Sequence, residues 1–353
     1  MPKNYANLSL RAKQRANPEG ILLEKSFSDE LSTLSYSNIL TYIRVAMNGV
    51  EPEYTQKSKD AGEKVKTHLG KVLSDVSFRY QGSVMTNTHI KAYSDIDLLV
   101  ISEKFYTWDS YKATQILESA EQRSKFYSSQ IQKLENEKSK SPYNGDPLAD
   151  LKEIRLDSET IMKATYQICD VSRPKAIKIK NLSLNREVDI VVSNWYDDVR
   201  SIISDKGDNR GIEVYNKDEH KKERVDYPFV SIQKINQKST ETNGRLKKMI
   251  RFLKTVKADS EHDIDLSSFD INAICFDIDV SKYENASFYQ LVPVLYFQLN
   301  SICTNQNHAD NIISVDEREY IFRGRTEKLE NIKLILKEIE ALFIDLKLNT
   351  NLV

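Results

Sequence analysis

Four short segments of the chain carry the apolar pattern of β-strands. Residues 176–180 and 186–192 alternate apolar and polar side chains with the period of a strand, and the residues between them are typical of a hairpin connection. Residues 98–101 form an uninterrupted apolar run, and residues 76–81 predict a further strand. Strands are therefore expected between residues 76 and 192.

Apolar residues at helical spacing predict helices before, between and after these strands. The first helix is expected to begin at Ser28, which would cap it. Its apolar residues are Leu31, Leu34, Ile39, Ile43 and Val45. The later predicted helices span residues 53–73, 105–138, 148–166, 230–241, 244–257, 268–276, 287–303 and 325–348. A proline- and glycine-containing stretch at 141–147 interrupts this pattern.

The mixed and the helical segments are expected to form separate parts of the molecule. Residues 1–24 are polar, contain proline and glycine, and predict a loosely held N-terminal arm. Residues 25–228 would contain the strands together with the N-terminal helices, and residues 229–353 would form a helical C-terminal lobe. The boundary is placed near Pro228, where a mixed stretch of loops gives way to a helical pattern.

Composition narrows the classes of protein that fit this pattern. The chain of 353 residues carries 51 basic and 52 acidic side chains, and this balance argues against a protein that binds long nucleic acid mainly through its phosphates. The three cysteines, Cys169, Cys275 and Cys303, lack the spacing of a zinc site or a disulfide framework. No apolar run has membrane-spanning or signal-peptide character, so a cytoplasmic protein is expected.

Two acidic residues stand at the start of the apolar run. Because side chains alternate along a strand, Asp95 and Asp97 project from the same face. Adjacent carboxylates disfavour each other's ionisation unless a cation neutralises them, and hard divalent ions with oxygen ligands do this best. The pair therefore predicts half of a magnesium site, although a surface strand end is the alternative for this motif alone.

A glycine and a serine follow the predicted strand 76–81. Gly82 would let the backbone approach a ligand closely, and Ser83 is expected to begin a helix whose free amide groups hold an anion. Phosphate at this helix end and a metal on the carboxylates would form a nucleoside triphosphate site. Taken alone, the Gly-Ser pair is also typical of an ordinary turn.

A third acidic residue lies within the predicted strand 186–192. Asp189 is flanked by Val188 and Ile190, and a carboxylate in a buried strand is costly unless it is paired or bound to metal. A salt bridge would explain it in isolation. With the acidic pair upstream, a third metal-binding carboxylate is favoured, and Asp189 is expected to lie beside Asp95 and Asp97.

The predicted helix 244–257 carries a basic face next to an apolar edge. Lys247, Arg251 and Lys254 recur at i, i+4 and i+7 on this face. If the face borders a binding cleft, the three cations would clamp a triphosphate. A solvated helix face is the alternative.

Together these motifs resemble a known family. Gly82-Ser83, Asp95-x-Asp97 and the later Asp189 resemble the signature of the DNA polymerase β-like nucleotidyltransferase superfamily. The length and the C-terminal helices are similar to those of the bacterial cGAS/DncV-like nucleotidyltransferases. The resemblance implies an α+β fold, in which a polymerase β-like nucleotidyltransferase core, a mixed twisted sheet with helices, is joined to a helical C-terminal lobe. It also implies an active site in the cleft between these two parts.

The resemblance assigns roles to individual residues. Two Mg²⁺ ions, for which Mn²⁺ could substitute, would bind to Asp95, Asp97 and Asp189. The expected nucleotide-binding residues are Gln81, Gly82, Ser83, Lys247, Arg251, Lys254, Ser268 and Asn194. Of these, Ser268 would contact phosphates, and Asn194 is a place to look for contact with the base.

The resemblance also implies an activity and its partners. Nucleoside triphosphates, ATP among them, would be joined in a magnesium-dependent reaction into a cyclic di- or trinucleotide messenger for antiphage (CBASS-type) signalling. An effector activated by the product and ancillary proteins of the same operon would be the partners. Two alternatives stay open: a nucleotidyltransferase for another acceptor, such as an RNA 3′ end, a small molecule or a protein, and a catalytically silent nucleotide-binding scaffold.

Overall fold

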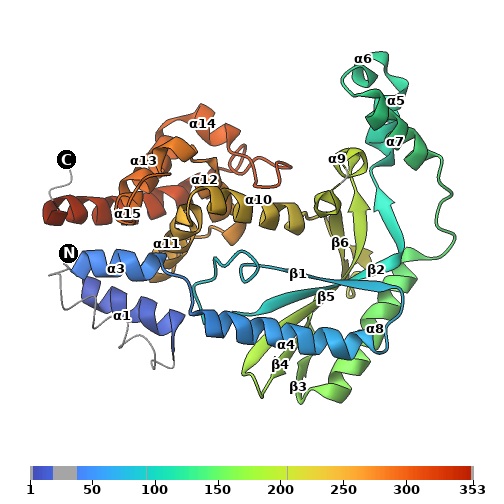
Figure 1. The fold of residues 1–353 in the computed structure, drawn as a ribbon, viewed down its shortest axis with the longest axis horizontal. Helices are drawn as coiled ribbons and strands as arrows, with labels where there is room; N and C mark the ends of the chain where they lie inside the picture. The colour runs from blue at the N-terminus through green and yellow to red at the C-terminus, as the bar shows by residue number, and fades with distance from the viewer. Residues whose placement is uncertain (1–2, 19–37, 93, 205, 351–353) are drawn as a thin grey trace. The chain divides into compact units, whose positions relative to one another are not determined.

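A computed structural model describes residues 3–18, 38–92, 94–204 and 206–350 of the chain. The chain separates into two compact units (Figure 1). The helical unit contains the described residues up to 55 together with residues 83–94 and 234–350, and the sheet unit contains residues 56–82 and the described part of 95–233. The boundary predicted near Pro228 lies close to that at residues 233 and 234, but the predicted contiguous division differs from these units, because N-terminal helices pack with C-terminal ones.

The sheet unit is built around a seven-stranded mixed sheet. Its main order is β1-β2-β5-β4-β3, while β6 pairs with both β5 and β7. The strands are β1 (Val76–Gln81), β2 (Ile96–Trp108), β3 (Ile168–Asp170), β4 (Ile177–Asn181), β5 (Arg186–Asp197), β6 (Gly211–Asn216) and β7 (Lys221–Lys222). The central strands β2 and β5 are parallel to each other, and the other pairs are antiparallel. The four strands predicted from the sequence are therefore confirmed, and they are neighbours in one sheet.

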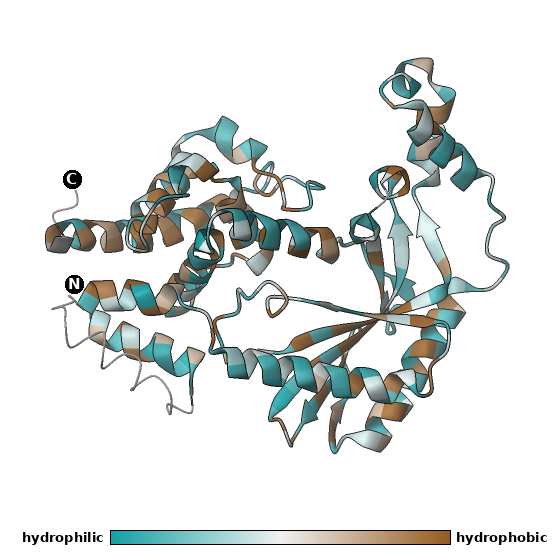
Figure 2. Ribbon diagram, viewed as in Figure 1, coloured by the Kyte–Doolittle hydropathy of each residue, from teal (hydrophilic) through white to brown (hydrophobic). Residues whose placement is uncertain are grey.

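Apolar residues of the central strands form the core of this unit. Figure 2 shows the apolar colouring concentrated on the strands at the centre of the sheet. Leu99, Ile101 and Val191 pack in one cluster with Trp195 and Phe229. Helix α8 (Pro147–Thr165) packs on β2 and β5. The other long helix, of which most residues belong to this unit, is α4 (Pro52–Gly70). Both helices confirm their predicted ranges within a few residues.

The predicted helix 105–138 is wrong in its first part. Strand β2 continues through the aromatic and β-branched residues up to Trp108. Three short helices follow, α5 (Ser110–Glu118), α6 (Ala120–Arg123) and α7 (Ser128–Lys138). Asp109 and Ser119 cap α5 and α6 with their side chains, and such local hydrogen bonds interrupt a continuous helix.

Helix α11 (Arg245–Asp259) lies at the centre of the helical unit. Its large apolar residues are at most 2% exposed, and each such side chain stabilises the fold by about 1.5–3 kcal/mol. They pack with α3 (Asn38–Met47), α12 (Ser268–Asp277), α13 (Leu291–Thr304) and α15 (Thr326–Thr350) in one core. Helices α10 (Pro228–Glu241) and α14 (Gln306–Asn311) complete the C-terminal part. The C-terminal helices predicted from the sequence are confirmed, except that α13 begins at Leu291.

The prediction of a loosely held N-terminal arm is wrong for residues 5–16, which form helix α1 (Tyr5–Ala16). Asn4 caps this helix, and Tyr5 and Leu8 pack against the apolar core. Helix α3 confirms the second half of the helix predicted from Ser28 onward, while its predicted start lies outside the described residues. The helix was missed because the polar residues of this segment and Pro18 just beyond it are also typical of an irregular arm.

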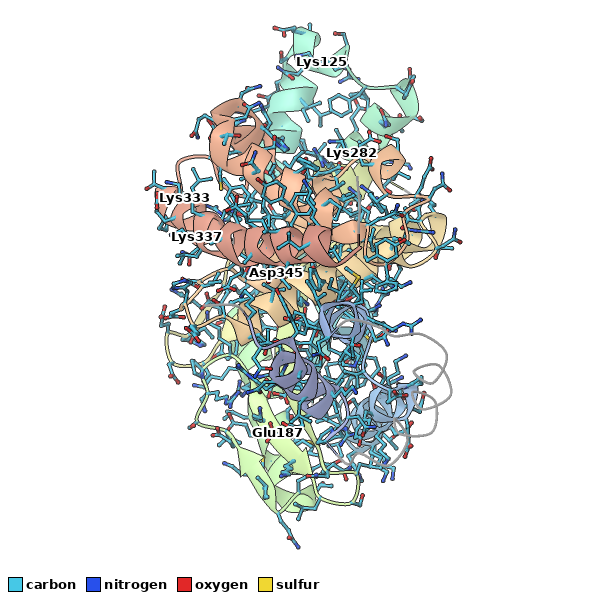
Figure 3. All side chains as sticks on the ribbon, turned by 90° about the vertical axis from the view of Figure 1, so that its left-hand side faces the viewer. Lys125, Glu187, Lys282, Lys333, Lys337 and Asp345 are labelled. Atoms are coloured by element: carbon cyan, nitrogen blue, oxygen red, sulfur yellow. The ribbon has the colours of Figure 1, made fainter. Side chains whose placement is uncertain are left out.

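The long helix α15 ends the described part of the chain. Figure 3 shows Lys333, Lys337 and Asp345 along it. The two lysines are exposed, whereas Asp345 is partly buried and accepts a hydrogen bond from Tyr5. Across the described residues, no helix combines the length and the apolar character that crossing a membrane requires.

Candidate functional site

A row of polar side chains crosses four neighbouring strands of the sheet. Gln81 of β1 is paired with Asp97 of β2, Asp97 with Asp189 of β5, and Asp189 with Lys178 of β4. Side chains directly opposite each other on neighbouring strands lie on the same face of a sheet. The predicted proximity of Asp189 to Asp97 is therefore confirmed.

The two paired carboxylates disfavour each other's ionisation. Burial, the facing Asp189 and the nearby Asp95 raise the pKa of Asp97 to about 7. Burial likewise raises the pKa of Asp189, with Asp95 adding to the effect, although Lys178 and Arg173 oppose it. This is the electrostatic environment that a bound cation relieves.

Two basic side chains already face these acids. The ammonium group of Lys178 lies 2.6 Å from Asp95 Oδ2 and 2.7 Å from Glu187 Oε2. Burial works against the charge of Lys178, but these hydrogen bonds raise its pKa. Arg173 lies 3.7 Å from Asp189 Oδ2. The acidic row is therefore only partly neutralised by the chain itself.

Glycine is required at position 82 by the position of Asp97. Gly82 has a φ of +89°, which favours glycine, and a Cβ atom there would lie 2.5 Å from Asp97 Oδ2. The close approach predicted for Gly82 is thus an approach to a carboxylate of the acidic row.

The acidic row has the donor chemistry of a site for a hard divalent cation. Asp189 Oδ1 and Gln81 Oε1 are buried without a hydrogen-bond partner, and all the candidate ligands are oxygens, which Mg²⁺ and Mn²⁺ prefer. In the part of the chain that the structure describes, no three acidic, histidine or cysteine side chains are yet spaced as a formed metal centre, and Lys178 engages Asp95. The oxygen atoms of these residues therefore fit a divalent ion, and this ion would compete with Lys178 for Asp95.

A separate pocket in the helical unit has the chemistry of an anion site. It has a volume of about 340 Å³, and its polar lining includes Ser83, Lys91, Lys254, Lys257, Ser267 and Ser268. These residues come from the 83–94 segment, from α11 and from the start of α12, where the positive end of the helix dipole favours an anion. The structure thus brings together three of the predicted nucleotide-binding residues, Ser83, Lys254 and Ser268.

Ser83 does not begin a helix, contrary to the prediction. Residues 83–87 form turns, closed by a hydrogen bond of 2.9 Å from the Thr88 amide to the Ser83 carbonyl. Asn87 has a positive φ of 52°, so a helix does not continue through it. The helix start at this pocket is that of α12, which Ser267 caps.

The basic face of α11 is divided between two roles. Lys254 lines the pocket, donates to Thr88, and has its pKa lowered by burial to about 8. Arg251 instead donates to the carbonyls of Met47 and Asn87, at 2.8 and 2.7 Å, and burial lowers its pKa to about 10. Burial also lowers the pKa of Lys247, which is not among the pocket's lining residues. The predicted three-residue clamp is therefore wrong for Arg251, which fixes the 83–94 segment in place.

Comparisons with known proteins decide the family. A profile of the cGAS/DncV-like nucleotidyltransferase C-terminal helical domain matches residues 233–343. The c-di-GMP synthase of Capnocytophaga granulosa is 52% identical over 351 residues, which are 98% of this chain and 98% of that protein. The chain belongs to the cGAS/DncV-like nucleotidyltransferases. A c-di-GMP synthase of a Lachnospiraceae bacterium is a further relative, 42% identical over 97% of this chain and 99% of that protein.

A solved structure of this family confirms the predicted fold class. The STING-associated CdnE c-di-GMP synthase from Flavobacteriaceae sp. superimposes with a TM-score of 0.90 at 38% identity, covering 99% of this chain and 100% of that one. The cGAS/DncV-like nucleotidyltransferase described here thus has an α+β fold with a polymerase β-like sheet and C-terminal helices. It is an enzyme, a nucleotidyltransferase of the cyclic-oligonucleotide synthase type.

One predicted binding residue of the nucleotidyltransferase lies elsewhere. Asn194 is buried in β5, five residues beyond Asp189, so its side chain points to the opposite face of the sheet. Its amide nitrogen donates to Thr107 Oγ1 and Glu213 Oε2, at 3.1 and 3.0 Å, and to a backbone carbonyl. This internal network contradicts the predicted contact of Asn194 with a nucleobase.

Sequence reasoning missed the basic partners of the acidic row. Lys178 was visible as a polar position of the alternating strand 176–180, and the hairpin to β5 brings it opposite Asp189. Its partner Glu187 is two residues before Asp189 and therefore on the same face. The hairpin length was the available signal, because it fixes which residues of β4 and β5 face each other.

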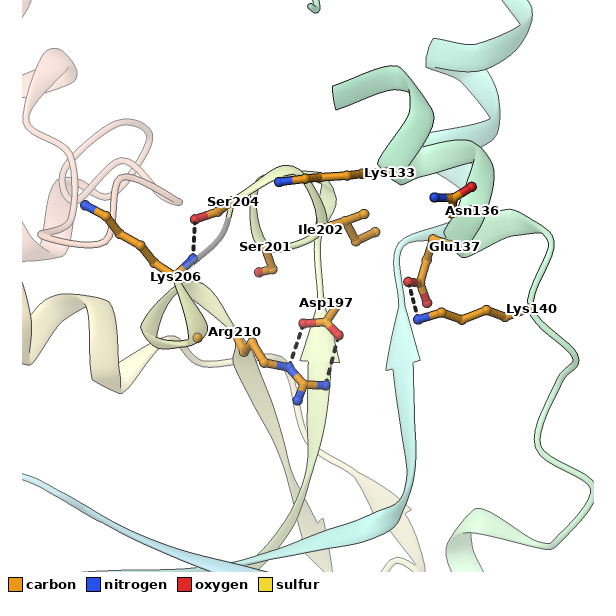
Figure 4. A pocket seen from close by; sticks show the side chains of 11 residues that line it. Lys133, Asn136, Glu137, Lys140, Asp197, Ser201, Ile202, Ser204, Lys206 and Arg210 are labelled. Atoms are coloured by element: carbon orange, nitrogen blue, oxygen red, sulfur yellow. Dashed lines mark hydrogen bonds and ion pairs between the residues drawn. The ribbon is translucent and has the colours of Figure 1, made fainter. Parts of the chain in front are cut away.

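A second cavity of the nucleotidyltransferase is lined by residues of the sheet unit (Figure 4). It measures about 340 Å³ and lies among α7, helix α9 (Val199–Ile203) and the loop that follows. Its acids are already paired with its bases: Asp197 binds Arg210 through two contacts of 2.9 Å, and Glu137 binds Lys140 at 2.8 Å. These ion pairs stabilise the local structure. Because its acids are already paired, we assign this cavity no role in the reaction.

Proposed function

We propose that this enzyme joins two molecules of GTP into c-di-GMP and releases one pyrophosphate in each of the two transfers. The observation that carries this proposal is the full-length similarity, at 52% and 42% identity, to two proteins named c-di-GMP synthase. This narrows the predicted cyclic di- or trinucleotide to one dinucleotide, and it favours GTP over the predicted ATP as substrate.

Asp95, Asp97 and Asp189 would hold the divalent ions, which we take to be two Mg²⁺ ions. A bound ion of this kind lowers the pKa of the attacking ribose hydroxyl and neutralises charge on the α-phosphate. Asp97 must be ionised to serve as a ligand, so protons and the metal ion compete for this carboxylate. Gly82 keeps the carboxylate of Asp97 free of steric contact.

The pocket of the helical unit would bind phosphate groups of a nucleotide. Lys254 and Lys257 supply positive charge, Ser83 and Ser268 supply hydroxyl donors, and the first amides of α12 add a favourable dipole. Arg251 acts indirectly, because it fixes the carbonyl of Asn87 and thereby the segment that carries Ser83.

We also propose a cytoplasmic role in antiphage signalling, with a STING-type effector as the receptor of the product. The supporting observation is that the Flavobacteriaceae relative is described as STING-associated. An effector that binds c-di-GMP would respond to this enzyme's product without contacting the enzyme.

The test is a product assay with purified protein, Mg²⁺ and radiolabelled triphosphates, supplied singly and together. GTP alone should yield a phosphatase-resistant product with the mass of c-di-GMP. The doubly substituted Asp95→Asn and Asp97→Asn protein should release no pyrophosphate, whereas Asp157→Asn, at an exposed position on α8, should retain activity. A product that forms only when ATP or an added acceptor is present would overturn the proposal.

A further inference from the structure

Lys178 occupies a place that a catalytic metal ion would compete for. Its ammonium group is hydrogen-bonded to Asp95 Oδ2 at 2.6 Å and ion-paired with Glu187 at 2.7 Å. The Lys178 side chain is 18% exposed, so these charge-assisted contacts are only partly screened by water. Asp95 is also a proposed metal ligand, and the positive charges of Lys178 and of a divalent ion would repel each other if both lay against this one carboxylate.

The charges around Lys178 favour such an exchange. Four carboxylates, those of Asp95, Asp97, Glu187 and Asp189, line this part of the sheet. Two cations face them, Lys178 and Arg173, and Arg173 is shared with Asp170, which lies 3.4 Å from it. The carboxylates therefore outnumber the cations here, and a divalent ion would balance the excess negative charge. Lys178 is the cation that engages Asp95, while Arg173 lies 3.7 Å from Asp189.

Glu187 gives Lys178 a second partner. It lies on the same face of β5 as Asp189, and its side chain is 41% exposed, so it can remain ionised at little desolvation cost. Figure 3 shows Glu187 near the end of the sheet.

We propose that Lys178 is a positioning residue that neutralises Asp95 in the metal-free enzyme and retains Glu187 as its partner when Asp95 turns to the divalent ion. The inference rests on the proposed metal-dependent function. In this arrangement Glu187 promotes metal binding without touching the metal, because it stabilises Lys178 away from Asp95.

The experiment measures Mn²⁺ binding to the full chain by calorimetry, without nucleotide. Lys178→Met removes the competing cation and should tighten the Mn²⁺ Kd by about twofold to fivefold, the size expected for one partly exposed charge pair. Lys178→Arg keeps the positive charge, and its guanidinium can hydrogen-bond to both Asp95 and Glu187. It should therefore weaken Mn²⁺ binding relative to the natural sequence. Lys175→Met, which removes an equal charge paired with Glu223 instead, should leave the Kd unchanged.

A double-substitution cycle separates this mechanism from simple charge effects. Glu187→Gln should weaken Mn²⁺ binding in the natural sequence but have no effect once Lys178 is Met, because Glu187 acts through Lys178. An equal weakening in both backgrounds, or an unchanged Kd in Lys178→Met, would overturn the inference. Absence of Mn²⁺ binding from the natural sequence and from Lys178→Met alike would instead overturn the proposed metal site itself.

Discussion

Replacing Asp97 with asparagine should stabilise the metal-free protein at alkaline pH. The pKa of Asp97 is raised from 3.8 to about 7 by burial and by Asp189 and Asp95, so the folded state binds this proton more tightly than the unfolded state does. The stability that the protonated group contributes is complete below about pH 4 and is lost as pH rises through about 7. Asn resembles the protonated acid, so Asp97→Asn removes this loss.

The size of the effect follows from the shift. A difference of about 3 pKa units, at 1.36 kcal/mol per unit, makes ionised Asp97 cost about 4 kcal/mol of folding free energy at about pH 8. At about pH 5 the cost is about 2 kcal/mol, because only the unfolded chain is ionised there. The free energy of unfolding of Asp97→Asn, relative to that of the natural sequence, should therefore increase by about 2–3 kcal/mol from about pH 5 to about pH 8.

Urea unfolding in the presence of EDTA measures this difference. The natural sequence, Asp97→Asn and the exposed control Asp157→Asn are compared at about pH 5 and about pH 8. Mg²⁺ should then stabilise the natural sequence but not Asp97→Asn, since an ion that binds only the folded state adds to its stability. An Asp97→Asn advantage that is the same at both pH values would refute the electrostatic coupling of the acidic row.

Three further results are expected. Burial lowers the pKa of Lys254 to about 8, so in steady-state assays the KM for GTP should increase at pH values above about 8. Lys254→Met should raise this KM about tenfold or more and abolish its pH dependence. Gly82→Ala places a Cβ atom 2.5 Å from Asp97 Oδ2 at a positive φ, so it should cost about 1–3 kcal/mol of stability and weaken Mn²⁺ binding measured by calorimetry. Arg251→Met leaves two carbonyls without their donor and should cost about 2–4 kcal/mol in thermal unfolding, whereas Lys248→Met on the same helix should cost much less.

The acidic row could be predicted because strand periodicity carries most of the information. Asp95 and Asp97 are two residues apart, and Asp189 interrupts a β-branched strand, so burial and side-chain direction were both readable. The pairing of Asp97 with Asp189 depends on a parallel contact between strands far apart in sequence. Only the resemblance to a family suggested that contact.

Helical residues with two available partners were harder to predict. Periodicity places Arg251 and Lys254 on one face of α11, but it does not say that Arg251 meets the end of α3 and the turn at Asn87 while Lys254 reaches a pocket. The prediction that Ser83 begins a helix was wrong for a similar reason, because helix starts and turns use the same residue types. Tertiary contacts decided these cases, and a single sequence does not contain them.

The docking of α1 bears on how this protein should be produced. Arg15 binds Asp259 through two contacts of 2.7 and 2.9 Å, and the Asp259 side chain is only 3% exposed and also accepts a hydrogen bond from Tyr42. Removing the chain up to and including Arg15, as is often done to aid crystallisation, would leave the buried carboxylate of Asp259 without the guanidinium of Arg15. The free energy of unfolding should then fall by about 3–5 kcal/mol. Purification tags therefore belong ahead of an intact first helix.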